Sequence, residues 1–407
     1  MRRAHWALLW LLMAPAAAAQ EELFDPPEAD FGKGATHEER LEQRLRASMQ
    51  RIPYIRTLFL IGGFLQLDGI SIVHKQDDPE QDTFYVSSIP FEAAPTIYRV
   101  SPKQSQLSWM SRTDVGLGYL WTRFDANLFP MDGQIYPVVN QLMMRWEDYL
   151  VVGKTYSTFM DNDSLPTTLD YNGPSGVTYV RQFLARVGLP LPHGVGIDAA
   201  VEQAETDLGL GEHRRSVSAK AVLPDFTGRL RYDSDTIHLQ LSGIVRKIEA
   251  RAVTVEDETR ERTLYGTGVS LSGTFALFGE DSLLFQGVTG KGIERYFNDP
   301  LSATGLAVGQ SQQPMLVRTS GATLYYQHTW NADCASVFGG SVLWVNTEGE
   351  RLPTASKRSV YASVNMMCRI TPTLIAGGEF LFGQLTRVDD ERAYNGRFQL
   401  SFRYLIF

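Results

Sequence analysis

Cysteine is scarce in this chain of 407 residues, which contains only Cys334 and Cys368. A scaffold held together by many disulfides is therefore excluded. Long hydrophobic runs are also lacking after residue 19, and no later segment is long and apolar enough for a transmembrane helix. A soluble exported enzyme and a membrane β-barrel both remain compatible with this absence, because a barrel strand needs only about 9 to 11 residues of alternating character.

Common catalytic motifs are missing as well. The sequence has no P-loop, no dinucleotide-binding fingerprint, no HExxH and no GxSxG pattern, and its seven histidines show no metal-ligand spacing. His238 and Ser242 face the same side of a predicted strand, but four residues of strand separate them by roughly 13 Å. We therefore predict no cofactor and no metal site, and an outer-membrane hydrolase acting through His238 remains an alternative.

The N-terminus predicts export. Arg2 and Arg3 precede an apolar core over 7–14, and 17–19 form a small-residue cleavage site, so 1–19 is typical of a signal peptide. Its removal leaves 36 basic and 46 acidic residues, a formal charge of −10 instead of −8. An acidic exported protein is not expected to bind nucleic acid.

A short leader is expected between the signal peptide and the barrel, over 20–56. Residues 20–35 are rich in proline and acid, which favours an extended segment. Thr36 and Glu39 form a capping-box pattern that predicts a helix over 36–52, ended by Pro53. This helix could trimerise, plug the barrel or merely tether it.

From residue 57 onward, apolar and polar residues alternate with the period of two that is typical of half-buried strands. In 393–407, for example, Phe398, Leu400 and Phe402 alternate with polar residues. The pattern predicts sixteen strands, over 58–73, 103–114, 116–128, 137–148, 149–160, 175–189, 193–207, 217–233, 235–251, 262–279, 281–295, 318–331, 334–347, 358–370, 373–388 and 392–407.

The connections between these strands alternate in length. Very short turns such as 233–235 and 331–333 alternate with longer loops such as 74–102, 161–175 and 296–317. Short turns on one rim and long loops on the other are typical of outer-membrane barrels. We therefore predict an all-β fold, a sixteen-stranded antiparallel transmembrane β-barrel over 57–407 whose lumen is aqueous.

Several segments resemble the DcaP-like outer-membrane porins. The segment VGKTYSTFMDNDSLPTTLDYNGPSG (152–176) is the most specific, and 223–232, 238–249 and 283–296 extend the resemblance over most of the barrel. The resemblance implies a trimeric porin in contact with outer-membrane lipid. It also implies passive uptake of small, preferentially anionic solutes such as dicarboxylates and aromatic acids.

A porin obtains its selectivity from pore width and from the charges that line the pore. Strand parity predicts a basic inward face that can bind anions, because arginine forks pair with carboxylates. Its members are Arg123, Lys154, Arg186, Arg229, Arg231, Arg246, Arg397 and Arg403. In the alternative, these groups pair with the inward acids Asp125, Asp198, Glu202 and Glu379, and the wall has no net selectivity. A plugged structural or adhesive barrel is a further alternative.

Trp121 and Tyr156 are predicted to share the inward face, as a surface for aromatic solutes or as packing beneath an infolded loop. Cys334 begins one predicted strand and Cys368 ends the next. Antiparallel pairing places them opposite each other at the short-turn rim, where an oxidising compartment favours a disulfide. The sequence does not indicate which loop narrows the pore.

Overall fold

The computed structural model describes residues 57–130, 132–204, 217–221, 223–253, 259–301, 306–308, 314–346 and 353–406. The predicted signal peptide over 1–19 and the predicted helix over 36–52 lie outside the described residues. Within the described part of the chain, no helix is long and apolar enough to cross a membrane.

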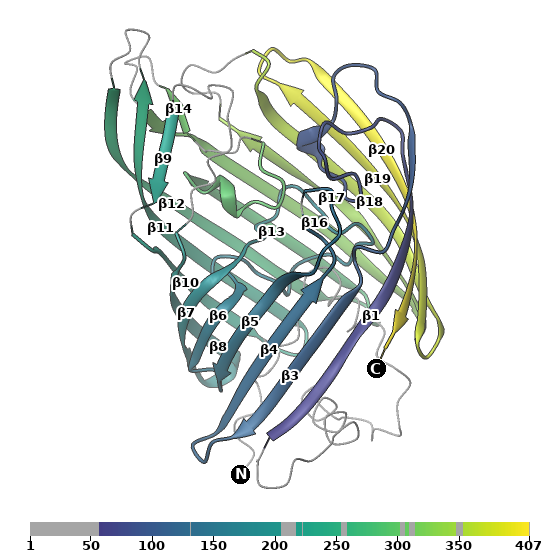
Figure 1. Cartoon of the computed structure of the whole chain (residues 1–407). Helices are drawn as coiled ribbons and strands as arrows, with labels where there is room; N and C mark the ends of the chain where they lie inside the picture. The colour runs from purple at the N-terminus through teal and green to yellow at the C-terminus, as the bar shows by residue number, and fades with distance from the viewer. Residues whose placement is uncertain are drawn as a thin grey trace.

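The fold is a closed antiparallel β-barrel with steeply tilted strands (Figure 1). Sixteen strands form its wall, and four short strands accompany them. In chain order the strands are β1 Thr57–Ile72, β2 Ile97–Ser101, β3 Gln106–Asp114, β4 Tyr119–Asn127, β5 Val138–Trp146, β6 Leu150–Tyr156, β7 Arg181–Pro190, β8 Val195–Glu202, β9 Val217–Ala221, β10 Asp225–Asp233, β11 Ile237–Val253, β12 Thr259–Ala276, β13 Ser282–Lys291, β14 Leu306–Val308, β15 Pro314–Leu316, β16 Arg318–Asn331, β17 Cys334–Val345, β18 Ser356–Thr371, β19 Leu374–Arg387 and β20 Arg392–Leu405.

The barrel closes where the first strand meets the last. One edge of β1 pairs with β20 over Phe64–Ile72, and its other edge pairs with β3 over Thr57–Phe64. Beyond β3, the short strand β2 continues the pairing with β1 as far as Ile72. Every wall strand therefore has a partner on both sides, so the sheet has no open edge.

The predicted alternation of connection lengths is confirmed. Turns such as 147–149, 332–333 and 372–373 join strands at one rim, which we call the short-turn rim. Connections such as 73–105, 157–180 and 292–317 join strands at the other end of the barrel, the long-loop rim. The strand β20 ends at the rim where β1 begins (Figure 1).

The strand pattern of the sequence gives the barrel two different faces. In β20 the outward side chains Phe398, Leu400, Phe402 and Tyr404 are about half exposed, whereas the intervening Arg397, Gln399, Ser401 and Arg403 are buried inside. The same alternation runs around the wall and produces an apolar outer belt of the kind that hydrocarbon requires. Tyr232 and Trp330 are exposed on the outer face near the short-turn rim.

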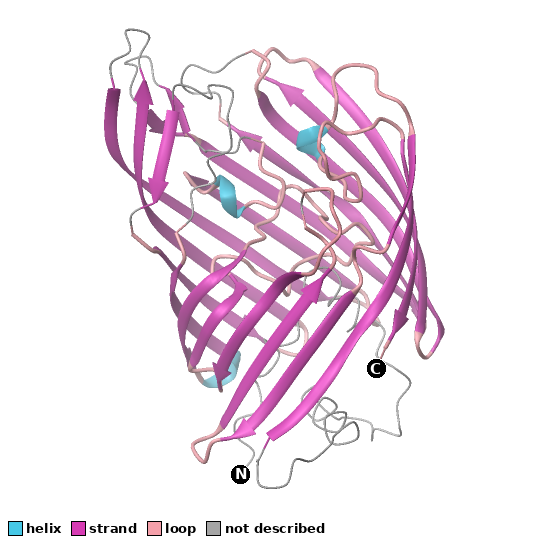
Figure 2. Ribbon diagram, in the orientation of Figure 1, coloured by secondary structure: helices cyan, strands magenta, loops and turns pink. Residues whose placement is uncertain are grey.

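Several predicted strands are shorter or broken in the structure. The strand predicted over 149–160 ends at Tyr156, and the one predicted over 175–189 begins only at Arg181. The residues between them, 157–180, fold into the barrel (Figure 2). The strand predicted over 217–233 is divided into β9 and β10, and β2 lies inside a segment predicted as a loop.

Cys334 and Cys368 face each other in the register of β17 and β18. The two residues are joined by a disulfide. The bond links β17 to β18 at the short-turn rim, so it closes the open end of the hairpin that these two strands form.

Gly63 lies where β1 exchanges its neighbour β3 for β2, and its φ is 144°. A Cβ atom there would lie 2.2 Å from the carbonyl oxygen of Gln106, whereas a Cβ on the adjacent Gly62 would meet nothing within 4 Å. The close approach of two backbones therefore requires glycine at position 63 but not at position 62.

We expect Gly63→Ala to lower the free energy of unfolding by about 1–3 kcal/mol, because the neighbouring strand must shift. Gly62→Ala, the matched control, is expected to change it little. Urea unfolding of the detergent-folded barrel, followed by tryptophan fluorescence, measures both. Equal midpoints for the two variants would contradict this account of the seam.

Candidate functional site

The segment 157–180 crosses the inside of the barrel, and we call it the constriction loop. At one end, Ser242 Oγ and Gln240 Nε2 on β11 donate hydrogen bonds to the carbonyl oxygens of Phe159 and Met160, at 2.7 and 2.9 Å. Further along, the carboxylate of Glu379 on β19 accepts the N–H groups of Leu169 and Asp170, at 2.9 and 2.7 Å. Wall strands that are far apart in the sequence therefore hold the loop across the lumen.

A second infolded segment, 73–96, packs against the constriction loop. Asp170 Oδ1 accepts hydrogen bonds from Phe84 N at 3.0 Å and from Thr83 Oγ1 at 3.2 Å. Phe84, together with Val86 and Ile89, is buried against the inner face of strands β16 to β20. This side of the lumen is therefore filled by packed apolar side chains.

A third infolded segment, 292–301, completes the arrangement. Asp299 Oδ2 accepts hydrogen bonds from Val86 N and Ser87 N at 2.7 and 3.2 Å, which fixes the second segment. Tyr296 donates its hydroxyl to Asp225 at 2.7 Å and packs edge-on against Phe159 of the constriction loop. The three segments interlock inside the barrel (Figure 2).

Three of the predicted anion-binding residues point inward and are buried, as Arg186 and Arg229 also are. Arg397 Nη1 lies 3.1 Å from Asp170 Oδ1, with a side chain that is 0% exposed. Arg246 donates to Asp225 at 2.9 Å and to the carbonyl oxygen of Gly292 at 2.8 Å. Arg403 Nε donates to Gln66 at 2.8 Å. Arg397 and Arg246 therefore hold infolded segments to the wall, whereas Arg403 joins the wall strands β20 and β1.

The prediction that Lys154 lines the pore is wrong. In the register, Lys154 pairs with Leu142 and Phe183, which are exposed on the outer face. Parity along β6 explains this, because Leu150 and Val152 belong to the same outward row as Lys154. The Lys154 ammonium donates to the carbonyl oxygen of Val139 at 2.8 Å.

Trp121 and Tyr156 lie inside the barrel and are both buried. Trp121 packs against Met110 and Met143. Tyr156 lies at the end of β6, next to Tyr179 of the constriction loop, with ring centroids 5.9 Å apart. Both rings therefore serve packing, and Tyr156 also borders the pocket described next.

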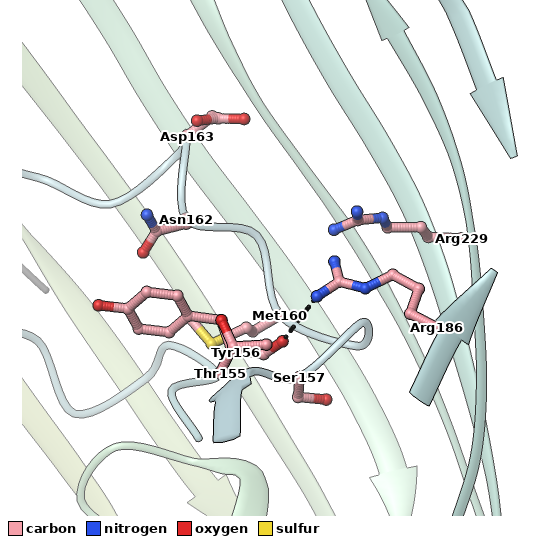
Figure 3. Close-up of a pocket in the computed structure, with 8 residues that line it drawn as sticks. All are labelled: Thr155, Tyr156, Ser157, Met160, Asn162, Asp163, Arg186 and Arg229. Atoms are coloured by element: carbon pink, nitrogen blue, oxygen red, sulfur yellow. Dashed lines mark hydrogen bonds between the residues drawn. The ribbon is translucent and has the colours of Figure 1, made fainter. Parts of the chain in front are cut away.

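The remaining arginines lie on the wall that faces the constriction loop. A pocket there is bordered by Arg186 and Arg229 on one side and by Asn162 and Asp163 of the loop on the other. Figure 3 shows both guanidinium groups directed into this space. Arg231 lies two residues along β10 from Arg229, on the same inward face.

Some of the predicted inward acids neutralise arginines on this wall. Arg123 Nε lies 2.6 Å from Asp125 Oδ2, and Arg229 Nε lies 2.5 Å from Asp198 Oδ2. Glu202 instead accepts the N–H of Thr158 at 2.7 Å, and so holds the loop as Glu379 does. The alternative in which inward acids neutralise the arginines therefore holds for Asp125 and Asp198. The other two acids, Glu202 and Glu379, bind the backbone of the constriction loop instead.

The candidate hydrolase pair does not form. Ser242 Oγ donates to the constriction loop. The His238 imidazole lies between two carboxylates, with Nδ1 2.6 Å from Asp233 Oδ1 and Nε2 3.1 Å from Asp161 Oδ1. The serine and the histidine therefore have different partners, and neither activates the other.

A family model described as DcaP outer membrane protein matches residues 138–406, more than half of the chain. The chain belongs to the DcaP outer membrane protein family. Its localisation is accordingly the outer membrane. No curated protein matches the sequence at a significant level.

Solved structures agree with this DcaP assignment at the level of the fold. The barrel is similar to the outer membrane channel DcaP of Acinetobacter baumannii, with a TM-score of 0.74 and 15% identity over 86% of this chain and 97% of that one. An anion-selective porin from Comamonas acidovorans has a TM-score of 0.53 and 11% identity, covering 86% of this chain and 100% of that one. OmpF of Salmonella typhi, in complex with daunomycin, has a TM-score of 0.52 and 6% identity, covering 88% and 100%. This DcaP-family barrel therefore has the fold of outer-membrane channels and porins.

Sequence reasoning missed the residues that fix the infolded segments of this DcaP-family barrel, chiefly Asp170 and Asp299. Both carboxylates are buried and accept backbone N–H groups from another segment. The available signal was a cluster of Asp, Asn, Pro and Gly over 161–176, which indicates a loop but not its partners.

Burial raises the pKa of Asp299 to about 6, in part against the hydrogen bonds from Val86 and Ser87. Its Oδ1 is also buried without a hydrogen-bond partner in the described part of the chain. Because the folded pKa lies above the ordinary value, ionised Asp299 destabilises the fold above pH 6, and this penalty disappears as the pH falls toward 4.

We expect Asp299→Asn to raise the free energy of unfolding at pH 8 by up to about 3 kcal/mol, since an amide oxygen can accept the same hydrogen bonds without a charge. The gain should vanish near pH 4, where the carboxyl of the wild-type protein is protonated. Urea midpoints of the wild type and the variant across this range measure the difference. A variant that is less stable at pH 8 would show that the charge itself is required.

Proposed function

We propose that this protein is a diffusion porin that favours small organic anions. The observation that carries the proposal is the group formed by Arg186, Arg229 and Arg231 on the wall facing the constriction loop, which we call the arginine wall. Arg229 and Arg231 lie two residues apart on the inward face of β10, and Arg186 borders the same pocket as Arg229. Such clustered guanidinium groups attract carboxylates and bind them through paired hydrogen bonds.

The charges near the arginine wall are not evenly placed. Asp198 pairs with Arg229 from the neighbouring strand β8, and Asp233 pairs with Arg231 at 2.8 Å close to the short-turn rim. Asp163 lies on the opposite side of the pocket, and burial raises the pKa of its carboxyl to about 6. The space between wall and loop is therefore lined by guanidinium groups on one side and by a weakly acidic group on the other.

Dicarboxylates and aromatic acids are the solutes that the family resemblance implies. Two guanidinium groups on one wall suit a solute with two carboxylates, and Tyr156 beside them offers a ring edge to an aromatic acid. The outer membrane channel and the anion-selective porin among the similar structures are precedents for a barrel of this shape. The homotrimer stays a prediction, based on the same resemblance.

A planar bilayer under a salt gradient tests the proposal. We expect stepwise conductance and a reversal potential of anion-selective sign, because the arginine wall places positive charge inside the barrel and so attracts anions. Replacing Arg186 and Arg229 together by Gln should lower the ratio of anion to cation permeability several-fold. Lys154→Gln is the matched control, since it removes one positive charge from the outer face and should leave selectivity unchanged.

The three possible failures have different meanings. A cation-selective wild type would overturn the anion preference while leaving the channel intact. An equal loss of selectivity in Lys154→Gln would mean that overall charge, and not the arginine wall, sets the preference. Absence of conductance from well-folded protein would favour the alternative of a plugged barrel.

A further inference from the structure

A second group of chemically active side chains lies beside the constriction loop, close to the short-turn rim. Asp161 and Asp163 come from the loop, His238 from the start of β11, and Asp233 from the end of β10. One ligand atom from each of Asp161, Asp163 and His238 lies within 4.8 Å of the others. We call these three residues and Asp233 the His238 cluster.

The spacing of the donors suits a metal ion. His238 Nε2 lies 3.1 Å from both oxygens of Asp161 and 3.9 Å from Asp163 Oδ2. Two ligands that bind one Zn²⁺ ion at ordinary bond lengths lie roughly 3 to 3.6 Å apart. Asp163 has to approach the other two ligands, and its side chain, which is 14% exposed and borders the pocket, belongs to the loop and not to a wall strand.

The other nitrogen of the imidazole is arranged as zinc ligands require. His238 Nδ1 lies 2.6 Å from Asp233 Oδ1, and Arg231 Nε holds the same carboxylate at 2.8 Å. A carboxylate on Nδ1 keeps the proton on that nitrogen and leaves the lone pair of Nε2 directed at the metal. Asp233 therefore orients the ligand without binding the ion.

The charge of the cluster also favours a cation. Within the cluster itself, three carboxylates surround one imidazole and one guanidinium, Arg231, while Arg186 and Arg229 face Asp163 across the pocket. An excess of carboxylates within a buried cluster is costly unless a cation compensates it.

An independent observation nearby points to a ligand. Gln240 lies two residues beyond His238 on the same inward face, opposite Ser272, which donates to Asp161 at 2.5 Å. The Gln240 side chain is buried, and its Oε1 accepts no hydrogen bond from the residues that the structure describes. The same amide donates through Nε2 to the carbonyl oxygen of Met160 at 2.9 Å, so the unpartnered oxygen lies beside the loop residue that directly precedes Asp161.

We propose that Asp161, Asp163 and His238 form a binding site for a divalent first-row transition-metal ion, with Zn²⁺ as the representative, and that the ion joins the constriction loop to β11. An imidazole with two carboxylates favours such an ion over Mg²⁺ or Ca²⁺, which prefer all-oxygen sites. The ion takes the place of a proton on His238 Nε2. The proposal does not depend on the anion preference, because it concerns the attachment of the loop and not the solute.

Isothermal titration of untagged, chelator-treated, detergent-folded protein with ZnCl₂ tests the site. We expect one Zn²⁺ per chain, unaffected by millimolar Mg²⁺. Asp163→Asn should weaken the affinity at least tenfold, His238→Asn should abolish the site, and Asp233→Asn should weaken it roughly tenfold through loss of orientation. The matched control is His328→Asn. His328 also pairs with a carboxylate, Asp281 at 2.9 Å, but among the described residues it belongs to no group of three metal-ligating side chains.

Circular dichroism shows whether each variant folds. If His238→Asn does not fold, Asp163→Asn still tests the site. This second variant is expected to fold, because the Asp163 carboxylate lies 3.9 Å from His238 and its loss breaks no short ion pair. Absence of stoichiometric Zn²⁺ binding would overturn the proposal. Binding that survives in both Asp163→Asn and His238→Asn, or that is lost in His328→Asn alone, would also overturn it. Conductance is not used as a readout, so the outcome is separate from that of the bilayer experiment.

Discussion

The pairing of β1 with β20 is the constraint on which the rest of the structure depends. Within hydrocarbon, each backbone N–H or C=O group without a partner costs several kcal/mol, so the sheet must close without an edge. Closure fixes the register of every strand, and register fixes which side chains face lipid and which face the lumen. The inward position of Arg229 and the outward position of Lys154 are both consequences of that single requirement.

The wall was predictable from the sequence because its signal is local. In β20 the alternation of large apolar and polar residues is complete, and the structure follows it residue by residue. The prediction of strand ends failed at Tyr156, where the chain leaves the wall and enters the lumen. The loop that follows is also buried, so it contains apolar residues such as Phe159 and Leu165 and resembles a strand in composition. The position of Lys154 follows from strand parity and not from its charge, because Leu150 and Val152 on the same side of β6 face outward.

The interior was less predictable, because it depends on contacts between segments that are distant in sequence. Asp299 holds Val86, and Glu379 holds Leu169, across separations of 213 and 210 residues. No periodicity within one segment contains that information. The arginines show the same limit, since parity places Arg186 and Arg397 on the same inner face, yet only the infolded segments decide that one borders a pocket and the other is covered.

The attachment of the constriction loop to the wall places its contacts inside the barrel, away from the exposed tips of the long loops. Loops tolerate sequence change better than the strands that they connect. The arginine wall and the hydrogen bonds from Ser242 and Glu379 lie inside the barrel. Sequence changes confined to the tips of the long loops therefore leave these interior contacts in place, so the surface of the protein and the lining of its lumen can change independently.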